Sequence, residues 1–312
     1  MLELILLILG LLGLLLGTEL IIKGALNIAE HYKISHLFMG LTILAIGTDL
    51  PELIIAIIGS IDRLLGIETS GLVVGDALGS CFGQIGLTLG IIGLFGILTL
   101  TKRELVRDGL MMVGSVVLLF LAGYDGKLTR FEGIMFILIY LFYFMSLRRE
   151  ERVHEKIKRS PTMHLLWDSV SLIGGFAILI YSSTIVVENA IELAQSWDIA
   201  QSLVGILIVG LGTSLPELAV SLGAIRKGAF RLSVGNLIGS NIFDILFTLG
   251  IGSAIAGFNV SKNLLRFDIP FLFALSVLVL LFFKRKMKIE RKEAIFLVLI
   301  YVVYVGLKIS GF

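Results

Sequence analysis

Two glutamates lie beside prolines in the middle of long apolar stretches of the chain. Residues 47–52 read GTDLPE and residues 212–217 read GTSLPE, and the two motifs end on Glu52 and Glu217. A charged side chain at the centre of a bilayer costs at least about 2.5–3.5 kcal/mol, so such residues usually face a polar cavity and have a function. One acid of this kind can be a protonated structural residue. Two at matching positions predict a cation site.

The prolines of the two motifs, Pro51 and Pro216, should break the helices in which they lie. Proline lacks a backbone N–H and clashes with the carbonyl one turn earlier. Carbonyls around 45–48 and 210–213 would then lack helical partners, which is tolerated at membrane depth only where protein, water or an ion satisfies them. A simple packing kink is the alternative. Free carbonyl oxygens with acids beside them would suit hard cations such as Na⁺ and Ca²⁺.

Two later stretches add polar residues at helical spacing. They recur at i, i+4 and i+8, and they are Asp76, Ser80 and Gln84 in the first stretch and Asn236, Ser240 and Asp244 in the second. With about 3.6 residues per turn, each set lies along one flank of a helix. Asp244, the two glutamates and the Gln84 oxygen give a site with three potential negative charges. That charge suits one Ca²⁺ or several Na⁺.

The elements that position these residues are expected to be membrane helices. Of the 312 residues, 57% are hydrophobic and only 16% charged, and the mean hydropathy is +1.00. A soluble domain of this size needs a more polar surface. Stretches of roughly 17–25 apolar residues, enough to cross a bilayer, recur along the chain. We place spans at 2–27, 36–60, 69–99, 106–123, 131–147, 164–190, 200–224, 231–258, 267–284 and 293–310, which predicts a multi-pass protein of the cell membrane.

The sequence also argues against several kinds of activity. One cysteine, Cys81, allows no internal disulfide and no cysteine metal cluster. No phosphate-binding loop or nucleotide motif is visible, so transport powered by ATP is not expected. We therefore expect no cofactor, no nucleic-acid partner and no enzymatic activity. The partners would be the transported ions and the lipid bilayer.

Basic residues predict the orientation in the membrane. The longest polar break, the linker 148–163, is rich in Lys and Arg and separates residues 1–147 from residues 164–312. If the N-terminus lies outside, this linker and the other inner loops hold most of the Lys and Arg residues. Such residues are retained on the cytoplasmic side. We therefore expect both termini outside and the linker in the cytoplasm.

The two segments are related in sequence. Residues 41–60 match 206–225 through G-T-x-L-P-E-L, and residues 71–90 match 231–250 through V-G-x-x-x-G-S. Each segment has five expected spans, an odd number, so the second copy must enter the membrane upside down. The expected fold is an all-α polytopic membrane protein with ten transmembrane helices in two inverted-topology repeats. Secondary transporters often have this architecture, with the substrate site near the midplane.

The doubled motifs resemble the alpha-repeats of the calcium/cation antiporter superfamily, and most closely the sodium/calcium exchanger family of prokaryotic type, without regulatory domains. The resemblance extends over the whole expected helix pattern and implies alternating-access antiport, with Na⁺ influx driving Ca²⁺ out. It implies a central site at Glu52, Glu217, Gln84 and Asp244. Flanking monovalent sites would use the hydroxyls and carbonyls of Ala45, Thr48, Ser80, Gly210, Thr213, Ser214 and Ser240.

The sequence departs from this family pattern in the first repeat. Asp49 stands where the second motif has Ser214, and Gln84 stands where relatives commonly carry Asn or Asp. Asp76, opposite Asn236, is a further acid that could modulate the site. An ionised Asp49 would strengthen cation binding, whereas a protonated one would allow proton coupling. Our hypothesis is that Asp49 alters the ion stoichiometry.

Three other functions remain as alternatives. A Ca²⁺/H⁺ exchanger of the same superfamily is the nearest and would transport H⁺ in place of Na⁺. A channel is disfavoured because broken helices with a closed acidic site favour occlusion over rapid passage. Asp76 and Asp244 could form the dyad of an intramembrane aspartyl protease. That alternative leaves both glutamates and the broken helices unexplained.

Overall fold

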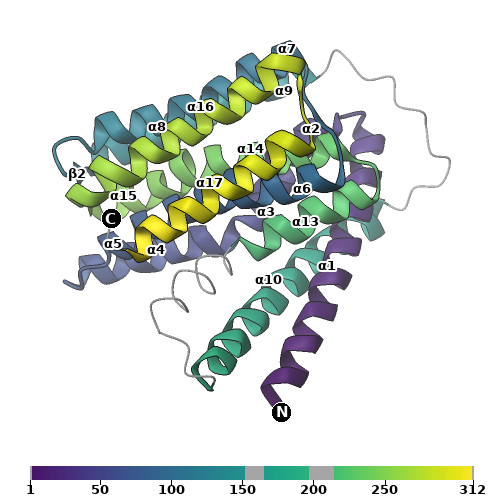
Figure 1. Cartoon of the computed structure of the whole chain (residues 1–312), viewed down its shortest axis with the longest axis horizontal. Coiled ribbons are helices and arrows are strands. Elements are labelled where there is room, and N and C mark those ends of the chain that lie inside the picture. The colour runs from purple at the N-terminus through teal and green to yellow at the C-terminus, as the bar shows by residue number, and fades with distance from the viewer. Residues whose placement is uncertain (1, 152–164, 197–213, 311–312) are drawn as a thin grey trace.

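The computed structural model describes residues 2–151, 165–196 and 214–310, and they are almost entirely helical (Figure 1). The elements of the first half are α1 (Leu2–Tyr32), α2 (His36–Met39), η1 (Gly40–Leu44), α3 (Ala45–Thr48), α4 (Leu50–Leu64), α5 (Ser70–Phe82), η2 (Gly83–Thr88), α6 (Leu89–Phe95), β1 (Leu98–Thr99), α7 (Lys102–Glu104), η3 (Leu105–Gly109), α8 (Leu110–Ala122), β2 (Lys127–Leu128) and α9 (Arg130–Glu151). The η elements are π-helical turns that continue the helices on either side.

The second half has a corresponding series of elements. They are α10 (Leu165–Ser196), α13 (Leu215–Arg226), α14 (Phe230–Phe243), η5 (Asp244–Thr248), α15 (Leu249–Ala256), β3 (Phe258–Asn259), η6 (Leu264–Asp268), α16 (Ile269–Lys286), β4 (Lys288–Ile289) and α17 (Arg291–Ile309). Each expected span is mostly helical where the structure describes it, but the expected spans 69–99 and 231–258 extend too far, because their last residues belong to the strands β1 and β3. Residues 200–213 of the expected span 200–224 lie outside the described residues.

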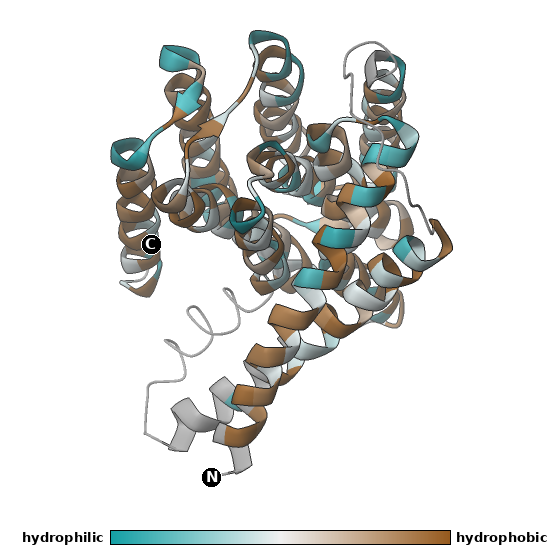
Figure 2. Ribbon diagram, turned by 90° about the vertical axis from the view of Figure 1, so that its right-hand side faces the viewer, coloured by the Kyte–Doolittle hydropathy of each residue, from teal (hydrophilic) through white to brown (hydrophobic). Residues whose placement is uncertain are grey.

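The helices have the length and composition of membrane spans. Among the described residues, seven helices are long and apolar enough to cross a bilayer, and the bent pair 36–48 and 50–64 makes up to eight. Figure 2 shows hydrophobic residues along the helices and hydrophilic residues gathered near their ends. Leucines such as Leu12 and Leu15 of α1 are more than half exposed, as expected of side chains that face lipid. The chain is therefore a multi-pass integral membrane protein.

Short β pairs join the two halves. Strand β1 pairs antiparallel with β4, and β2 pairs antiparallel with β3. Strands β1 and β3 each lie at the end of the third expected span of their half. Each pairs with a strand of the other half, β4 or β2, that precedes the fifth expected span there. The π-helical turns also match, since η2 corresponds to η5 and η3 to η6. This correspondence supports the predicted repeat, and the orientation in the membrane stays a prediction.

The core is divided into two hydrophobic clusters. The larger one joins α4–α9 with α14–α17, and the smaller one joins α1 and α10 with α13 and part of α2–η1. Helices α1 and α10 run side by side and extend away from the remaining bundle (Figure 1). Their backbones approach closely at Gly17, where an added Cβ would lie 2.9 Å from the Leu179 nitrogen. The α1–α10 pair is therefore a packing unit distinct from the larger core.

Candidate cation site

The first GT-x-LPE motif breaks its helix as the proline predicts. Asp49 has φ −85° and ψ 8°, outside the α-helical range, and it separates α3 from α4. The helices on either side of the break are bent by 47°. Pro51 lies in the first turn of α4, and it cannot donate a backbone hydrogen bond to the Gly47 carbonyl.

The second motif has the same local backbone where the structure describes it. Ser214 has φ −87° and ψ 5° immediately before α13, and Pro216 follows in the first turn of that helix. Glu52 and Glu217 therefore occupy matching positions in the first turns of α4 and α13. Free N–H groups at the start of a helix favour negative charge there.

The breaks bring three carboxylates together. Asp49, Glu52 and Glu217 each offer an oxygen that lies within 4.8 Å of the other two, and all three side chains are fully buried. Both oxygens of Asp49, both of Glu217 and one of Glu52 have no hydrogen-bond partner within the described residues. Burying a carboxylate without a partner is costly, because the protein must replace the water that solvates the charge. Such a cluster of converging, unsatisfied oxygens is suited to binding a cation.

Asp244 joins this cluster through Gln84 and Ser80. The Gln84 side-chain nitrogen donates hydrogen bonds to Asp244 Oδ2 (3.1 Å) and to Ser80 Oγ (3.0 Å), and the Ser80 hydroxyl donates to Glu52 Oε1 (3.4 Å). The other Asp244 oxygen, Oδ1, is buried and has no hydrogen-bond partner among the described residues. Both Gln84 and Asp244 lie at the start of a π-helical turn, an irregularity that often occurs at functional sites.

The orientation of the Gln84 amide bears on the role that the sequence predicts for its oxygen. The Gln84 oxygen, expected to be a cation ligand, accepts a hydrogen bond from Asn241 Nδ2 (2.7 Å). The same Asn241 nitrogen donates to the Leu237 carbonyl (3.0 Å), which fixes the direction of the Asn241 amide. The Gln84 oxygen must therefore face Asn241, and its nitrogen must face Asp244. In this arrangement the Gln84 nitrogen orients a carboxylate, and one lone pair of its oxygen is taken up by Asn241.

Asn241 is a residue that the sequence analysis missed. It lies on α14 directly after Ser240, so it falls outside the i, i+4, i+8 row of Asn236, Ser240 and Asp244. The matching position of the first repeat is Cys81, whose thiol lies 3.9 Å from the Asn241 carbonyl. A polar amide next to Ser240 was the available signal. Its importance appears only when α14 is packed against η2.

The remaining residues expected at the flanking sites have different environments. Thr48, Ser214 and Ser240 are buried, and the hydroxyls of both serines have no partner within the described residues. The Ala45 carbonyl, which was expected to be free, instead accepts from the Asp49 N–H (3.0 Å) and the Thr48 hydroxyl (3.3 Å) because α3 continues to Thr48. Gly210 and Thr213 lie outside the described residues.

The two residues at the start of the polar rows differ in burial and contacts. Asp76 is partly exposed on α5, whereas Asn236 is buried on α14 and donates to Ser221 Oγ (3.3 Å). Asp76 is not one of the three acids whose oxygens converge. It therefore stays a candidate modulator of the site.

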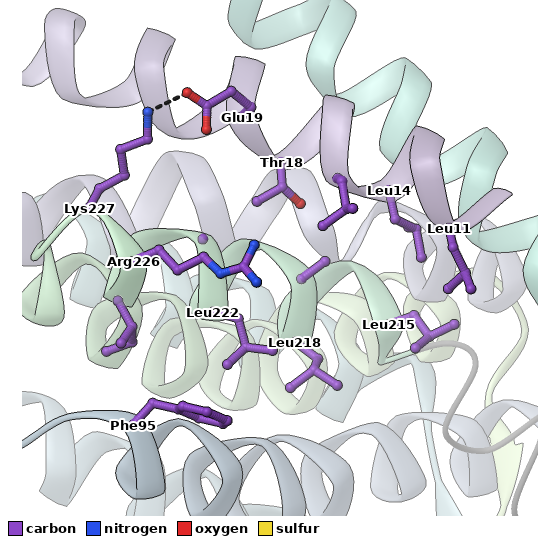
Figure 3. A pocket seen from close by; sticks show the side chains of 14 residues that line it. Leu11, Leu14, Thr18, Glu19, Phe95, Leu215, Leu218, Leu222, Arg226 and Lys227 are labelled. Atoms are coloured by element: carbon purple, nitrogen blue, oxygen red, sulfur yellow. Dashed lines mark hydrogen bonds and ion pairs between the residues drawn. The ribbon is translucent and has the colours of Figure 1, made fainter. Parts of the chain in front are cut away.

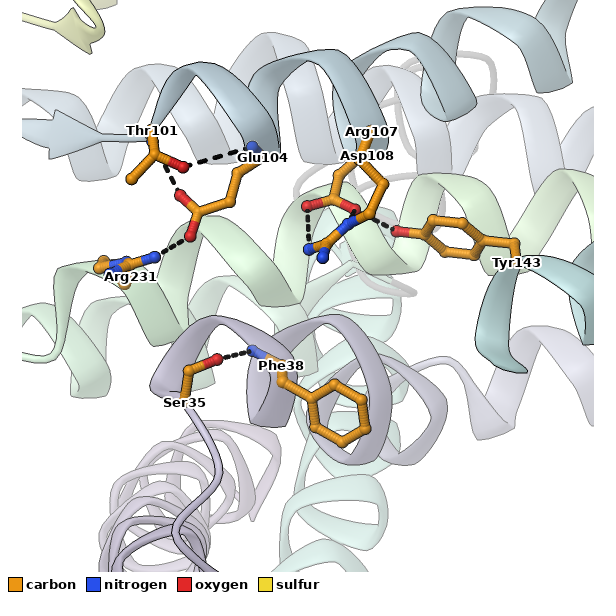
Figure 4. A network of polar contacts seen from close by, with 8 residues as sticks. All are labelled: Ser35, Phe38, Thr101, Glu104, Arg107, Asp108, Tyr143 and Arg231. Carbon is orange, nitrogen blue, oxygen red and sulfur yellow. Dashed lines mark hydrogen bonds and ion pairs between the residues drawn. The ribbon is translucent and has the colours of Figure 1, made fainter. Parts of the chain in front are cut away.

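Two further buried acids were not predicted, and they occupy matching positions. Asp108 of η3 accepts hydrogen bonds from Tyr143 (3.0 Å) and from Arg107 (2.6 and 2.8 Å) (Figure 4). Asp268 of η6 accepts from Tyr304 (2.8 Å) and Lys308 (3.0 Å). Each acid is thus satisfied by a phenol and a cation. We call these the two Asp–Tyr networks.

The sequence carried a signal for these networks. Residues 130–143 and 291–304 share the pattern R-x-E-x-I-x-x-x-L-I-Y-x-x-Y, which ends on Tyr143 and Tyr304. This third match lies in the last expected span of each repeat. It extends the internal similarity beyond the two motifs that carry the carboxylates.

Sequence comparison connects this geometry with known proteins. The profile of the family described as sodium/calcium exchanger protein matches residues 2–147 and 167–310. The chain is 29% identical to the sodium/calcium exchanger MaX1 of Methanosarcina acetivorans over 96% of both chains. It is 34% identical to the inner membrane protein YrbG of Escherichia coli over 80% of this chain and 79% of that protein. It is also 33% identical to the putative antiporter CaxA of Alkalimonas amylolytica over 79% of each.

Structural comparison agrees with the sequence matches. A solved structure of the sodium-calcium exchanger NCX_Mj, soaked with Na⁺ and Ca²⁺, superposes with a TM-score of 0.84 at 27% sequence identity. The superposition covers 98% of both chains. A second structure of that protein, soaked with Na⁺ and Sr²⁺, gives the same TM-score at 28% identity. The likeness therefore extends over nearly the whole helical bundle.

Proposed function

The chain belongs to the sodium/calcium exchanger family, and we propose that it exchanges Na⁺ for Ca²⁺ across the membrane by alternating access at the carboxylate cluster. The family consists of transporters, so the intramembrane protease alternative is dropped. The observation that carries the proposal is the convergence of the buried, unpartnered oxygens of Asp49, Glu52 and Glu217. MaX1 and NCX_Mj, both named sodium/calcium exchangers, support the choice of ions.

The charge of the site explains how binding leads to exchange. Among the described residues, no ion pair joins a lysine or arginine to Asp49, Glu52, Glu217 or Asp244. Uncompensated charges in a low-dielectric interior carry a penalty of several kcal/mol each. Either one Ca²⁺ or several Na⁺ can lower that penalty, and both would need the same oxygens. The two ions would therefore compete, and movement of the site without any cation would be unfavourable.

The residues divide into ligands and supporting groups in this proposal. Glu52, Glu217 and Asp49 hold the divalent ion, and Asp244 contributes Oδ1. Hydroxyl groups of Thr48, Ser80, Ser214 and Ser240, with Thr213 and carbonyls near Ala45 and Gly210, complete the Na⁺ positions. Gln84 and Asn241 orient Asp244.

The topology is part of the proposal. Residues 1–147 and 164–312 form two five-helix repeats of opposite orientation, with residues 148–163 as a cytoplasmic linker and both termini outside. The matching backbone at Asp49 and Ser214 and the crossed strand pairs support the repeat. Antibody or cysteine labelling of the two termini in sealed, right-side-out vesicles tests the orientation, and labelling from the inside alone would overturn it.

Ion flux tests the exchange itself. Purified protein in sealed vesicles should take up ⁴⁵Ca²⁺ when an outward Na⁺ gradient is imposed, and it should fail to do so with K⁺ in place of Na⁺. Glu217→Gln should abolish the uptake, whereas Glu132→Gln, which alters an exposed acid at the start of α9, should preserve it. Uptake driven by a pH gradient without Na⁺ would instead select the Ca²⁺/H⁺ exchanger. Asp49, an extra acid that the second motif lacks, is the feature that favours that second candidate.

A further inference from the structure

A groove lies between α1 and α13, and no carboxylate of the cluster is among its described lining residues (Figure 3). Its volume is about 690 Å³, and α1, α13 and Phe95 at the end of α6 line it. One end of the groove lies where α13 terminates at Arg226 and the chain turns toward α14. Helix ends of this kind lie near the membrane–water interface. The groove therefore extends from that interface along two membrane helices.

Most of the side chains that line the groove are apolar. Leu11 and Leu14 of α1 face Leu218 and Leu222 of α13 across it (Figure 3), and Leu15 also lines it. Leu11 and Leu15 are 45% and 55% exposed, so the groove is open to the surroundings of the helix bundle. Those surroundings are lipid in a membrane protein. An acyl chain is thus the occupant whose chemistry fits these walls.

Polar groups are concentrated at one end of the groove. Lys227 pairs with Glu19, which neutralises both charges. The Arg226 side chain has no hydrogen bond or ion pair with any described residue, and Figure 3 shows its guanidinium extending between Thr18 and Leu222. One positive charge is therefore left without compensation beside the apolar groove. That arrangement complements a single phosphodiester negative charge.

Thr18 provides a second polar contact. Its side chain is 7% exposed, and its hydroxyl has no partner within the described residues. A buried hydroxyl without a partner has a free donor, and a lipid phosphate or ester oxygen that enters between α1 and α13 could accept from it. The helices approach each other at this point, because a Cβ on Gly223 would lie 2.2 Å from the Thr18 methyl group. The polar end of the groove is therefore a defined site between two helices.

We propose that this groove binds an anionic phospholipid, with an acyl chain against the leucines, the phosphate on Arg226 and a headgroup or ester oxygen on Thr18. The bound lipid touches α1 and α13, which share the smaller core with α10, and α13 carries Glu217. Lipid occupancy would therefore change how readily the α1–α10 pair shifts against α13. The proposal does not depend on which ions the protein exchanges.

Lipid binding is measured on the purified full-length protein by native mass spectrometry. The probes are 1-palmitoyl-2-oleoyl phosphatidylglycerol, which is anionic, and the matching phosphatidylcholine, which is zwitterionic. Wild type should retain one phosphatidylglycerol with at least about fivefold preference, the effect expected of one interfacial cation. Arg226→Gln should lower phosphatidylglycerol binding about fivefold. Arg226→Lys should restore most of it, because the charge is kept.

Two more variants separate the groove from surface charge. Arg285→Gln removes an exposed arginine from the end of α16, outside the groove, and should bind phosphatidylglycerol as wild type does. Leu218→Trp fills the groove without altering charge and should also lose the lipid. Equal binding of both lipids by wild type, unchanged binding in Arg226→Gln, or an equal loss in Arg285→Gln would each overturn the proposal. Initial rates of Ca²⁺ uptake in vesicles of either lipid then give the effect on transport.

Discussion

The two GT-x-LPE motifs share a backbone but differ in charge. Asp49 and Ser214 have φ and ψ values within a few degrees of each other, and each precedes a helix with proline and glutamate in its first turn. The first repeat places its second acid here, at Asp49, and has the amide Gln84 on the following span. The second repeat has the neutral Ser214 and places its second acid at Asp244.

Each repeat therefore contributes two carboxylates, but from different elements. The backbone break is common to both halves because proline and the turn require it, whereas single side-chain changes move the charge. The group of three converging acids is consequently asymmetric, with two members from the first half of the chain and one from the second. The comparison teaches that the fold determines where oxygens converge and that the side chains determine how many charges they carry. Four variants test this view.

The largest effect is expected where the halves are most alike. Glu52→Gln and Glu217→Gln each remove one charged ligand from matching helix starts, so both should weaken Ca²⁺ binding at least about hundredfold, beyond the effect of residues that only orient ligands. Isothermal titration of the purified variants with Ca²⁺ measures this. A loss confined to one glutamate would show that the two motifs are not equivalent. Glu132→Gln is the control, since that acid only caps α9.

Asp49→Ser makes the two motifs identical and tests their main difference. Removal of one buried carboxylate near Glu52 and Glu217 should lower Ca²⁺ affinity about tenfold. The lost attraction to Ca²⁺ amounts to several kcal/mol at roughly 5 Å and an effective dielectric constant of 20, but it is partly offset because the repulsion between Asp49 and the two glutamates is also removed. The number of Na⁺ ions exchanged per Ca²⁺ should also fall. Flux at a series of imposed Na⁺ gradients and membrane potentials gives that number. Unchanged dependence on Na⁺ and H⁺ would refute a role of Asp49 in stoichiometry.

Asn241→Leu tests the asymmetry between Asn241 and Cys81. Loss of the Asn241 amide frees the Gln84 side chain to rotate, so its nitrogen no longer holds Asp244. We expect Ca²⁺ affinity to fall about tenfold, as for residues that orient metal ligands, and the ratio of Ca²⁺ to Na⁺ affinity to change. Asn189→Leu is a matched control, because Asn189 also donates to the carbonyl four residues earlier but lies on α10. Equal changes in both variants would assign Asn241 a purely structural role.

The sequence predicted the features that depend on local chemistry. The helix break at Pro51, the burial of both glutamates and the helical segments follow from proline, charge and apolar length. The orientation of Gln84 could not be predicted, because it depends on Asn241 from a helix more than 150 residues away in sequence. The Ala45 carbonyl was misjudged since the helix continues up to Thr48 before it breaks.

The Asp–Tyr networks were missed for a related reason. Each joins an acid to a tyrosine 35 or 36 residues later, and only the packing of two helices brings them together. A comparison of the last spans would have shown the shared tyrosines. It would not have shown that their hydroxyls reach buried acids, because that contact depends on how the helices are placed.

These networks provide the smallest predicted effect. Tyr143→Phe and Tyr304→Phe each remove a hydrogen bond to a buried carboxylate, which is worth about 1.5–3 kcal/mol of folding stability. Asp108 keeps two hydrogen bonds from Arg107, whereas Asp268 keeps one from Lys308. Tyr304→Phe should therefore lower the thermal unfolding temperature more than Tyr143→Phe does. Tyr301→Phe is the control, because no hydrogen bond of its hydroxyl is found within the described residues. Ca²⁺ affinity of the folded variants should stay at the wild-type value, and a large loss of affinity would connect these networks to the cation site.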